Sequence, residues 1–322
     1  MTRALWYYQS NPNPLTTNGT VEWSAYSDIE TEIIEDAFHA NQKHVELNSC
    51  AIDLQNKVQM NKQDKQKQLS VKRIANAKRE GSLRQERFFL PQQLTSFSDK
   101  YVPGFGWEWR NKCYGSRCDP NTSDIVEKAS EGIMIEGKAL GRLCEAKWLA
   151  AKLRGVKNKD NDTIVKCCLS LYTRECFLYK LVNHTMREDD KSKQETLGPL
   201  CYLLQYKGWL SFFRHPKLIV YRGMNLDAEQ ISSYQNAVGE WKCWIGFSST
   251  SKQREVAELF GNTLFIIHFH DQLTPSSIDI SSFSFIPDEE EVLLLPTCQF
   301  FVEKVIFNSQ TQKYNIYLND AW

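Results

Sequence analysis

The chain has 322 residues, 39 basic and 39 acidic side chains, and a formal net charge of +0 at pH 7. This balance argues against wholesale electrostatic binding to nucleic acid or to an anionic membrane surface. Hydrophobic residues at 42% and aromatic residues at 12% are enough for ordinary cores, which excludes a disordered chain.

The N-terminal residues Met1-Thr2-Arg3-Ala4-Leu5 do not begin a secretory signal, and no apolar stretch approaches the length of a membrane span. We therefore expect an intracellular protein, cytoplasmic or nuclear, with no membrane and no nucleic acid among its partners. The ten cysteines are then expected to be reduced thiols. Their spacing matches no zinc motif, so we expect no metal.

Residues 1–80 are predicted to form a small unit with short strands and one helix. Ser27 offers an N-cap, and apolar side chains follow it at helical spacing. Aromatic and β-branched runs predict the strands, at residues 6–8, 21–26, 44–47, 51–54 and 68–73. One helix against a small sheet is an α+β module.

Residues 81–124 are predicted to be a linker, because prolines and glycines interrupt any long element and the segment starts with a basic stretch. Trp107 and Trp109 indicate that part of this segment packs against a neighbour.

Residues 125–322 are predicted to form a second α+β domain, with helices first and strands after them. The apolar residues from Val165 to Val182 recur at a spacing that predicts a buried helix. Mostly antiparallel strands are expected farther on, at residues 218–221, 241–247, 264–269, 278–280, 292–295, 302–307 and 314–318.

Separated motifs in the first unit occur in an order that resembles the WWE domain. They are Trp6, Trp23-Ser24-Ala25-Tyr26, Ile34-Glu35-Asp36-Ala37-Phe38, Ile52-Asp53-Leu54, Val58-Gln59-Met60-Asn61 and Val71-Lys72-Arg73. The resemblance implies a half-barrel sheet with one helix, and a module that binds ADP-ribose or the iso-ADP-ribose of poly(ADP-ribose). Tyr8 and Gln59 match pocket positions of that family.

Two positions of the first unit depart from the WWE pattern. Cys50 stands where many poly(ADP-ribose)-binding members have Tyr, and Leu69 stands near the expected pocket Arg. Bidentate Arg is the preferred phosphate ligand, so an alternative remains in which the aromatic residues only fill a small core.

Three motifs in the second domain end or begin predicted strands. Arg222 closes an apolar strand and precedes Gly223, and its guanidinium suits a diphosphate. Ser249 opens a Ser-Thr-Ser run whose hydroxyls can cap a helix or orient a side chain. Glu289 and Glu291 precede an apolar strand, and strand periodicity predicts that they share one face while Glu290 points away.

This ordered set resembles the R-S-E class of ADP-ribosyltransferases, over residues 125–318. The fold implied is a group of helices followed by a mostly antiparallel split β-sandwich. Arg222 would bind the diphosphate of NAD, Gly223 the nicotinamide amide through its backbone, and Ser249 would orient Glu291. Glu291 would stabilise the positive charge that develops on the ribose.

The resemblance further implies that Glu289 receives an arginine of an acceptor protein, as a Glu at this position does in arginine-modifying members. We predict a mono-ADP-ribosyltransferase that uses NAD as a substrate. Two alternatives remain: an NAD glycohydrolase on the same fold, with water as acceptor, and a non-catalytic protein that binds ADP-ribose.

Overall fold

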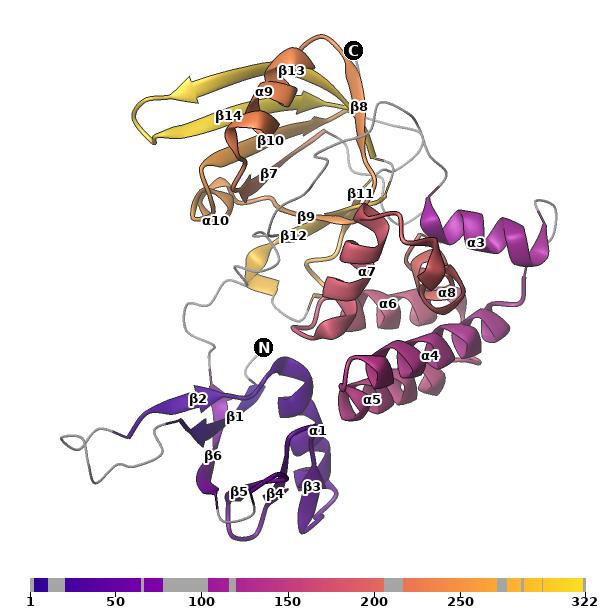
Figure 1. The fold of residues 1–322 in the computed structure, drawn as a ribbon, viewed down its shortest axis with the longest axis vertical. Coiled ribbons are helices and arrows are strands. Elements are labelled where there is room, and N and C mark those ends of the chain that lie inside the picture. The colour runs from indigo at the N-terminus through magenta and orange to yellow at the C-terminus, as the bar shows by residue number, and fades with distance from the viewer. Residues whose placement is uncertain are drawn as a thin grey trace.

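The protein is described by a computed structural model with two sheets and a group of helices (Figure 1). The structure describes residues 3–10, 21–64, 67–77, 104–115, 120–205, 217–270, 277–284, 287–296 and 298–320. Most of the predicted linker, residues 81–103, lies outside these ranges. No helix in the described part of the chain is long and apolar enough to cross a membrane.

The N-terminal unit is a six-stranded sheet, in the order β2-β1-β6-β5-β4-β3, with helix α1 packed against it. Its elements are β1 (Arg3–Gln9), β2 (Trp23–Ala25), α1 (Asp28–His39), β3 (His44–Glu46), β4 (Cys50–Asp53), β5 (Val58–Asn61) and β6 (Gln68–Ala77). Helix α1 begins with a capping box, in which Ser27 and Glu30 bond each other's backbone amides. The predicted α+β module is thereby confirmed.

Glu35 ties α1 to the sheet through two side chains, Trp6 of β1 and Arg73 of β6. It accepts hydrogen bonds from Trp6 Nε1 at 2.7 Å and from the guanidinium of Arg73 at 2.6 and 3.0 Å, and His39 lies at 2.9 Å. The hydrogen bond from Arg73 is the main cause that holds the pKa of Glu35 below its usual value. The carboxylate is therefore a structural centre of this unit.

We expect Glu35→Gln to destabilise the N-terminal unit by about 2 kcal/mol at pH 7, because charge-assisted hydrogen bonds are lost. Since the folded-state pKa is depressed, the stabilisation is present above the unfolded pKa of about 4.3 and is lost as the pH falls through the folded pKa. Hydrogen exchange of α1 at pH 7 and at about pH 3, well below the unfolded pKa, measures this. A difference between variant and parent that does not shrink at the lower pH contradicts the assignment.

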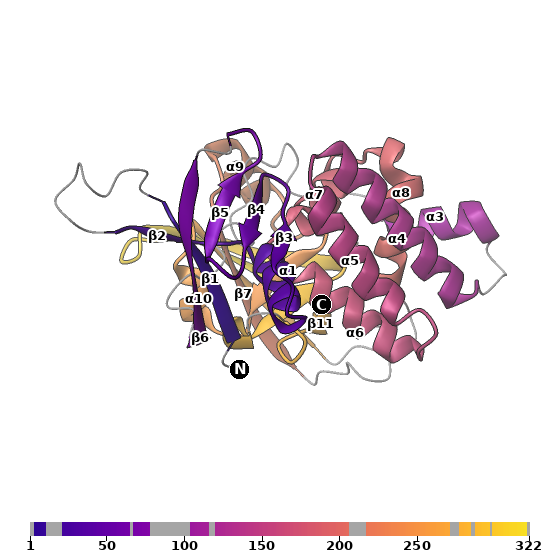
Figure 2. The ribbon, with the colours of Figure 1, turned by 90° about the horizontal axis from the view of Figure 1, so that it is seen from below.

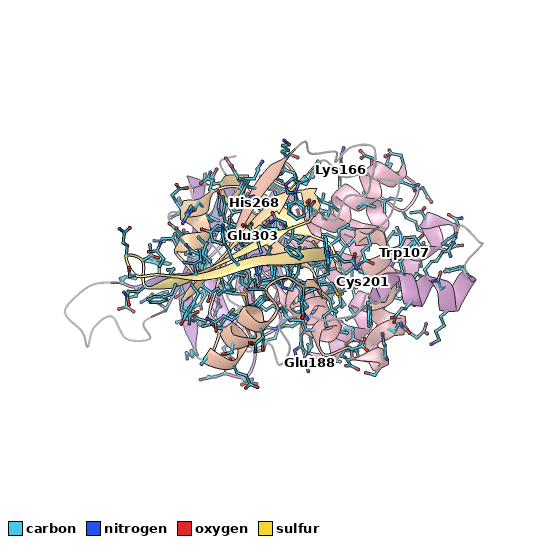
Figure 3. The ribbon with its side chains drawn as sticks, turned by 90° about the horizontal axis from the view of Figure 1, so that it is seen from above. Trp107, Lys166, Glu188, Cys201, His268 and Glu303 are labelled. Carbon is cyan, nitrogen blue, oxygen red and sulfur yellow. The ribbon has the colours of Figure 1, made fainter. Side chains whose placement is uncertain are left out.

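Helices α3 to α8 form the middle of the molecule. They are α3 (Phe105–Tyr114), α4 (Thr122–Ala139), α5 (Leu143–Gly155), α6 (Asn161–Tyr172), α7 (Phe177–Arg187) and α8 (Gln194–Leu204), with a 3₁₀ turn at Lys191–Lys193. Helix α3 lies inside the predicted linker but packs against α8, with Trp109 fully buried. Trp107 and Cys201, on these two helices, lie well away from His268 and Glu303 on the sheet (Figure 3). The helical part thus begins earlier than residue 125.

The single helix predicted across residues 165–182 is wrong, because the structure has two helices there. Helix α6 ends at Tyr172 and α7 begins at Phe177. Thr173 turns its hydroxyl back to the carbonyl of Ser170 at 2.9 Å, and Cys176 has an extended backbone. The apolar period continues across the break because both helices bury one face in the same core.

The C-terminal sheet has eight strands in the order β11-β12-β9-β7-β10-β14-β13-β8. Its elements are β7 (Leu218–Met224), α9 (Ala228–Asn236), β8 (Trp241–Trp244), β9 (Ser248–Ser251), α10 (Arg254–Glu258), β10 (Thr263–Phe269), β11 (Ser277–Asp279), β12 (Glu291–Leu294), β13 (Cys298–Asn308) and β14 (Lys313–Asn319). Among the strand pairs of the described residues in this sheet, only β10 and β14 run parallel. Strands β7 and β9 share one paired position, and the sheet divides there into two parts that diverge in Figure 1.

The fold class is the predicted α+β arrangement, with two differences in the C-terminal sheet. The Ser-Thr-Ser run forms strand β9 itself, although the sequence predicted that the strand ends at Phe247 and that these hydroxyls could cap a helix. Helix α9 was not predicted, although Asp227 and Gln230 form a capping box at its start. Its apolar face is narrow, with Ile231 and Tyr234 buried, so hydrophobic periodicity gives little signal.

Candidate active site

The strand order brings three of the predicted site residues onto neighbouring strands. Arg222 lies on β7, Ser249 on β9 and Glu291 at the first position of β12, and these strands are adjacent in the sheet. Their exposed fractions are 2%, 5% and 0%, and Glu289 is also 0% exposed. The structure therefore gathers two buried carboxylates and a buried guanidinium in one place.

Arg222 links β7 to β9 through its guanidinium. Its Nη1 donates to the carbonyl oxygen of Ser249 at 2.5 Å. Burial and the nearby charge of Arg187 lower the pKa of Arg222 to about 10, while the charge of Glu291 acts in the opposite direction. The side chain thus remains a cation at neutral pH, close enough to Glu291 for the two charges to interact.

The acidic run reaches its geometry by a route that strand periodicity does not describe. Glu289 ends a 3₁₀ turn, Glu290 has a positive φ of 43°, and the strand begins only at Glu291. The left-handed residue between them places both neighbours inside, whereas Glu290 is partly exposed. The sequence argument predicted the inward and outward side chains but gave the wrong cause for them.

The hydroxyls that hold the acidic run belong to Thr250 and Ser251. Thr250 Oγ1 donates to the carbonyl of Val292 at 2.7 Å, and Ser251 Oγ donates to the carbonyl of Glu289 at 2.8 Å. The Lys252 amide donates to the carbonyl of Glu290 at 3.1 Å. These hydrogen bonds hold the turn in its strained conformation. A non-glycine residue keeps a positive φ only where contacts with its surroundings compensate for the strain.

Ser249 is connected to the site in two ways. It pairs with Leu293 in the β9–β12 ladder, so it lies on the same face as Glu291, which pairs with Ser251. The hydrogen bond described for Ser249 is the one that its carbonyl accepts from Arg222. A hydroxyl contact from Ser249 to Glu291 stays a prediction.

Gly223 has a packing role that the sequence did not suggest. A Cβ at this position would lie 1.9 Å from the carbonyl oxygen of Ala257 and 2.6 Å from that of Phe260. The lack of a side chain lets β7 lie directly against α10, and this contact supports the strand that carries Arg222. The predicted backbone contact of Gly223 with nicotinamide stays a prediction.

Two further polar residues, which the sequence analysis did not select, lie on α7 near Gly246, and the charge of one of them, Arg187, acts on Arg222. Asn183 and Arg187 are one turn apart near the end of α7, and both approach Gly246. The Asn183 amide donates to the hydroxyl of Tyr172 at 2.7 Å. Burial lowers the pKa of Arg187, while Tyr172 and Glu188 act on that pKa in the opposite direction. Their spacing of four residues, which puts them on one face of a helix, was the only feature of the sequence that could have pointed to them as a pair.

The like charges of Arg187 and Arg222 repel each other, and burial of the two side chains adds to the cost. Such an arrangement is typical of a site for an anion, since a bound phosphate would offset both charges. Arg222 and Arg187 therefore form a cationic half of the site, and Glu289 and Glu291 form an anionic half. Ligands with separate anionic and cationic parts fit this division.

The two residues selected in the N-terminal unit lie near each other around Tyr26. The rings of Tyr8 and Tyr26 are 5.0 Å apart, and the Tyr26 hydroxyl donates to Gln59 Oε1 at 2.5 Å. Burial is the main cause that raises the pKa of Tyr26, and burial raises the pKa of Cys50 to about 11. The carbonyl oxygen of Gln59 is thus already engaged inside the protein.

A cleft of 540 Å³ lies between the N-terminal unit and the helices, apart from the cluster around Arg222. Its lining combines apolar and charged side chains: Ser27, Glu30, Leu140, Arg142, Glu145, Glu175, Cys176, Phe177, Lys180, Leu181 and His184. Most of these charged groups are paired, as Lys180 is with Glu175 at 2.8 Å. We assign no ligand to this cleft.

Comparison with known proteins agrees with both units. Residues 146–321 match the family NAD:arginine ADP-ribosyltransferase, and residues 4–73 match the WWE domain. No curated protein matches the chain. Because the first match covers more than half of the 322 residues, the chain belongs to the NAD:arginine ADP-ribosyltransferase family. It is an NAD-dependent mono-ADP-ribosyltransferase that carries a WWE domain, the module class that binds ADP-ribose.

Several solved structures resemble the chain, among them the ADP-ribosyltransferase HopU1. Exoenzyme S from Pseudomonas aeruginosa, bound to carba-NAD and human 14-3-3 protein beta, is 17% identical with a TM-score of 0.43, over 62% of this chain and 88% of that chain. HopU1 of Pseudomonas syringae is 18% identical with a TM-score of 0.43, over 69% and 99%. The type III effector XopAI from Xanthomonas axonopodis is 16% identical with a TM-score of 0.45, over 67% and 95%.

Proposed function

We propose that this protein transfers ADP-ribose from NAD to an arginine side chain of an acceptor protein. The observation that supports it best is the joint burial of Arg222, Glu289 and Glu291 at neighbouring strand ends. A buried acidic pair is costly unless a cation offsets it, and a substrate that develops positive charge provides one during the reaction.

In the proposed reaction the bond between nicotinamide and ribose breaks, and nicotinamide leaves with the bonding electron pair. Glu291 stabilises the positive charge on the ribose, a role like that of a carboxylate in glycoside cleavage. Arg222 and Arg187 hold the diphosphate. An arginine nitrogen of the acceptor then forms the new bond to the ribose carbon and loses a proton, which Glu289 accepts.

Glu289 and Glu291 have no exposed surface, so the ligands enter only if the side chains over them move.

The WWE domain is proposed to bind ADP-ribose or poly(ADP-ribose), with Tyr8 and Gln59 in its pocket. The Tyr26 hydroxyl donates to the carbonyl oxygen of Gln59, so the amide nitrogen of Gln59 remains to serve as the donor to such a ligand.

Incubation with labelled NAD, with and without agmatine, tests the acceptor. ADP-ribosyl-agmatine is the expected product, since agmatine presents the guanidinium of arginine. Free ADP-ribose as the sole product would assign the protein to the NAD glycohydrolases. If NAD is not consumed under either condition, both activities are rejected and a non-catalytic ADP-ribose-binding role takes their place.

We expect Glu289→Gln to lower transfer to agmatine by about 100-fold and to leave NAD hydrolysis within about threefold of the parent, because general-base help is lost only for the acceptor step. The control is Glu290→Gln, whose side chain is partly exposed and next in the chain. Equal losses of transfer and hydrolysis in Glu289→Gln would refute this division of roles.

A further inference from the structure

The WWE helix α1 is built into the core of the catalytic helices. Ile29 has no exposed surface and belongs to the same hydrophobic cluster as α4 to α8, although it lies in the N-terminal unit. Figure 2 shows α1 between the WWE sheet and α5. Asp36 contacts Trp148 at 2.9 Å and Lys152 at 3.0 Å, and Asn48 accepts from the Cys144 amide at 2.8 Å.

The same helix holds the break between α6 and α7. Asp28 is only 3% exposed, and its Oδ2 accepts a hydrogen bond from the Glu175 amide at 2.9 Å. Glu32 pairs with Arg174 at 3.1 Å. A buried carboxylate needs such partners, because an uncompensated one is strongly destabilising. Two acidic side chains of α1 thus bind two consecutive residues of the break.

The break is directly connected to the anion-binding side of the active site. Tyr172 ends α6, its ring lies 5.4 Å from that of Phe247, and its hydroxyl accepts from Asn183. The next helix, α7, begins just beyond the break and carries both Asn183 and Arg187. The charge of Arg187 in turn acts on Arg222. A shift of residues 173–176 would therefore displace Asn183 and Arg187 together.

We propose that Asp28 and Glu32 are positioning residues for NAD binding: they act through the turn at residues 173–176 on the placement of Asn183 and Arg187. This proposal rests on the proposed function in that Arg187 contacts the NAD diphosphate. The WWE domain would then support NAD binding by the catalytic domain, in addition to binding any ligand of its own.

Two variants of the full chain test the proposal. Asp28→Ala removes the acceptor of the Glu175 amide, and Glu32→Gln removes the ion pair with Arg174. Each variant is expected to raise the NAD Kd and KM by about tenfold and to leave kcat within about twofold. The contacts of Asp36 and Asn48 remain, so both variants keep the docked arrangement.

Glu46→Gln is the matched control, since Glu46 is a WWE carboxylate whose side chain is 64% exposed and forms an ion pair with Lys62 at 2.8 Å. Its Kd and KM are expected to equal those of the parent. A charge exchange, Glu32→Arg with Arg174→Glu, is expected to restore much of the affinity lost in Glu32→Gln. Hydrogen exchange is expected to rise in α7 of Asp28→Ala and not in α4.

An unchanged NAD Kd in folded Glu32→Gln and Asp28→Ala overturns the proposal. Equal changes in Kd and kcat, with a lower melting temperature, also overturn it, since they indicate general destabilisation. Should Asp28→Ala fail to fold, the Kd of Glu32→Gln and its charge exchange decides the question. Because the readout is equilibrium binding, absence of ADP-ribosyl-agmatine with the parent protein rejects the proposed function without affecting this result.

Discussion

Replacing Glu291 by Gln is expected to lower every NAD-cleaving activity of this protein by about 100- to 1000-fold. The side chain is fully buried at the start of β12, near the charge of Arg222, and it is the carboxylate assigned to the developing charge on the ribose. Gln has nearly the same shape but carries no charge, so the loss falls on the transition state. NAD consumption and nicotinamide release measure it.

The control for Glu291→Gln is again Glu290→Gln, which removes a charge from the adjacent residue. Glu290 contributes through its carbonyl oxygen, which accepts from the Lys252 amide, and that contact does not depend on the side chain. Its activity is expected to stay within about twofold of the parent, as is usual for surface substitutions. A Glu291→Gln protein with more than a tenth of the parent activity would show that charge stabilisation lies elsewhere.

Replacing Gly223 by Ala is expected to destabilise the catalytic domain by about 3 kcal/mol, at the upper end of what overpacking costs. The new methyl group would lie 1.9 Å from the carbonyl oxygen of Ala257, and a backbone atom cannot rotate away as a side chain can. Strand β7 must then move from α10, and Arg222 moves with it. We therefore expect lower NAD affinity as well as a lower melting temperature.

Gly155→Ala provides the matched control for this substitution. Gly155 ends α5, its would-be Cβ lies within 4 Å of no described atom outside its chain neighbours and its own helix backbone, and its φ is not in the left-handed region. Alanine there is expected to be neutral or to stabilise by up to about 1 kcal/mol. Denaturation of the two variants under the same conditions separates the steric effect at Gly223 from the general effect of replacing glycine. Equal stability of both variants would contradict the close packing of β7 on α10.

The WWE match and the contacts of α1 change how the two units are understood together. A reader domain on a flexible tether would be separable from the enzyme. Here Ile29 completes the core of the catalytic helices, and Asp28 and Glu32 bind the turn before α7. Removing residues 1–77 would expose that core and leave the Glu175 amide without its acceptor.

Much of the architecture could be predicted because local pattern and burial agree. The capping box at Ser27, the β13–β14 hairpin and the α+β order of both units follow from residues close in the chain. The set Arg222, Ser249, Glu289 and Glu291 could also be selected, because each residue lies at or beside the end of an apolar strand. That these residues share one site was implied by the resemblance to ADP-ribosyltransferases, and the adjacency of β7, β9 and β12 agrees with it.

The remaining features depend on contacts between residues far apart in the chain. Hydrophobic periodicity cannot reveal the break after Tyr172, because α6 and α7 bury their faces in one core and the break is held by Asp28 from another domain. It cannot reveal that Glu290 adopts a positive φ, because the bonds around that turn come from Ser251 and Lys252. The sequence specified which side chains have the charge and the functional groups that the proposed chemistry needs. Tertiary packing decided which of them share a site. Side chains of like charge repel each other, so they stay close together only where contacts with the surrounding backbone and side chains hold them in place.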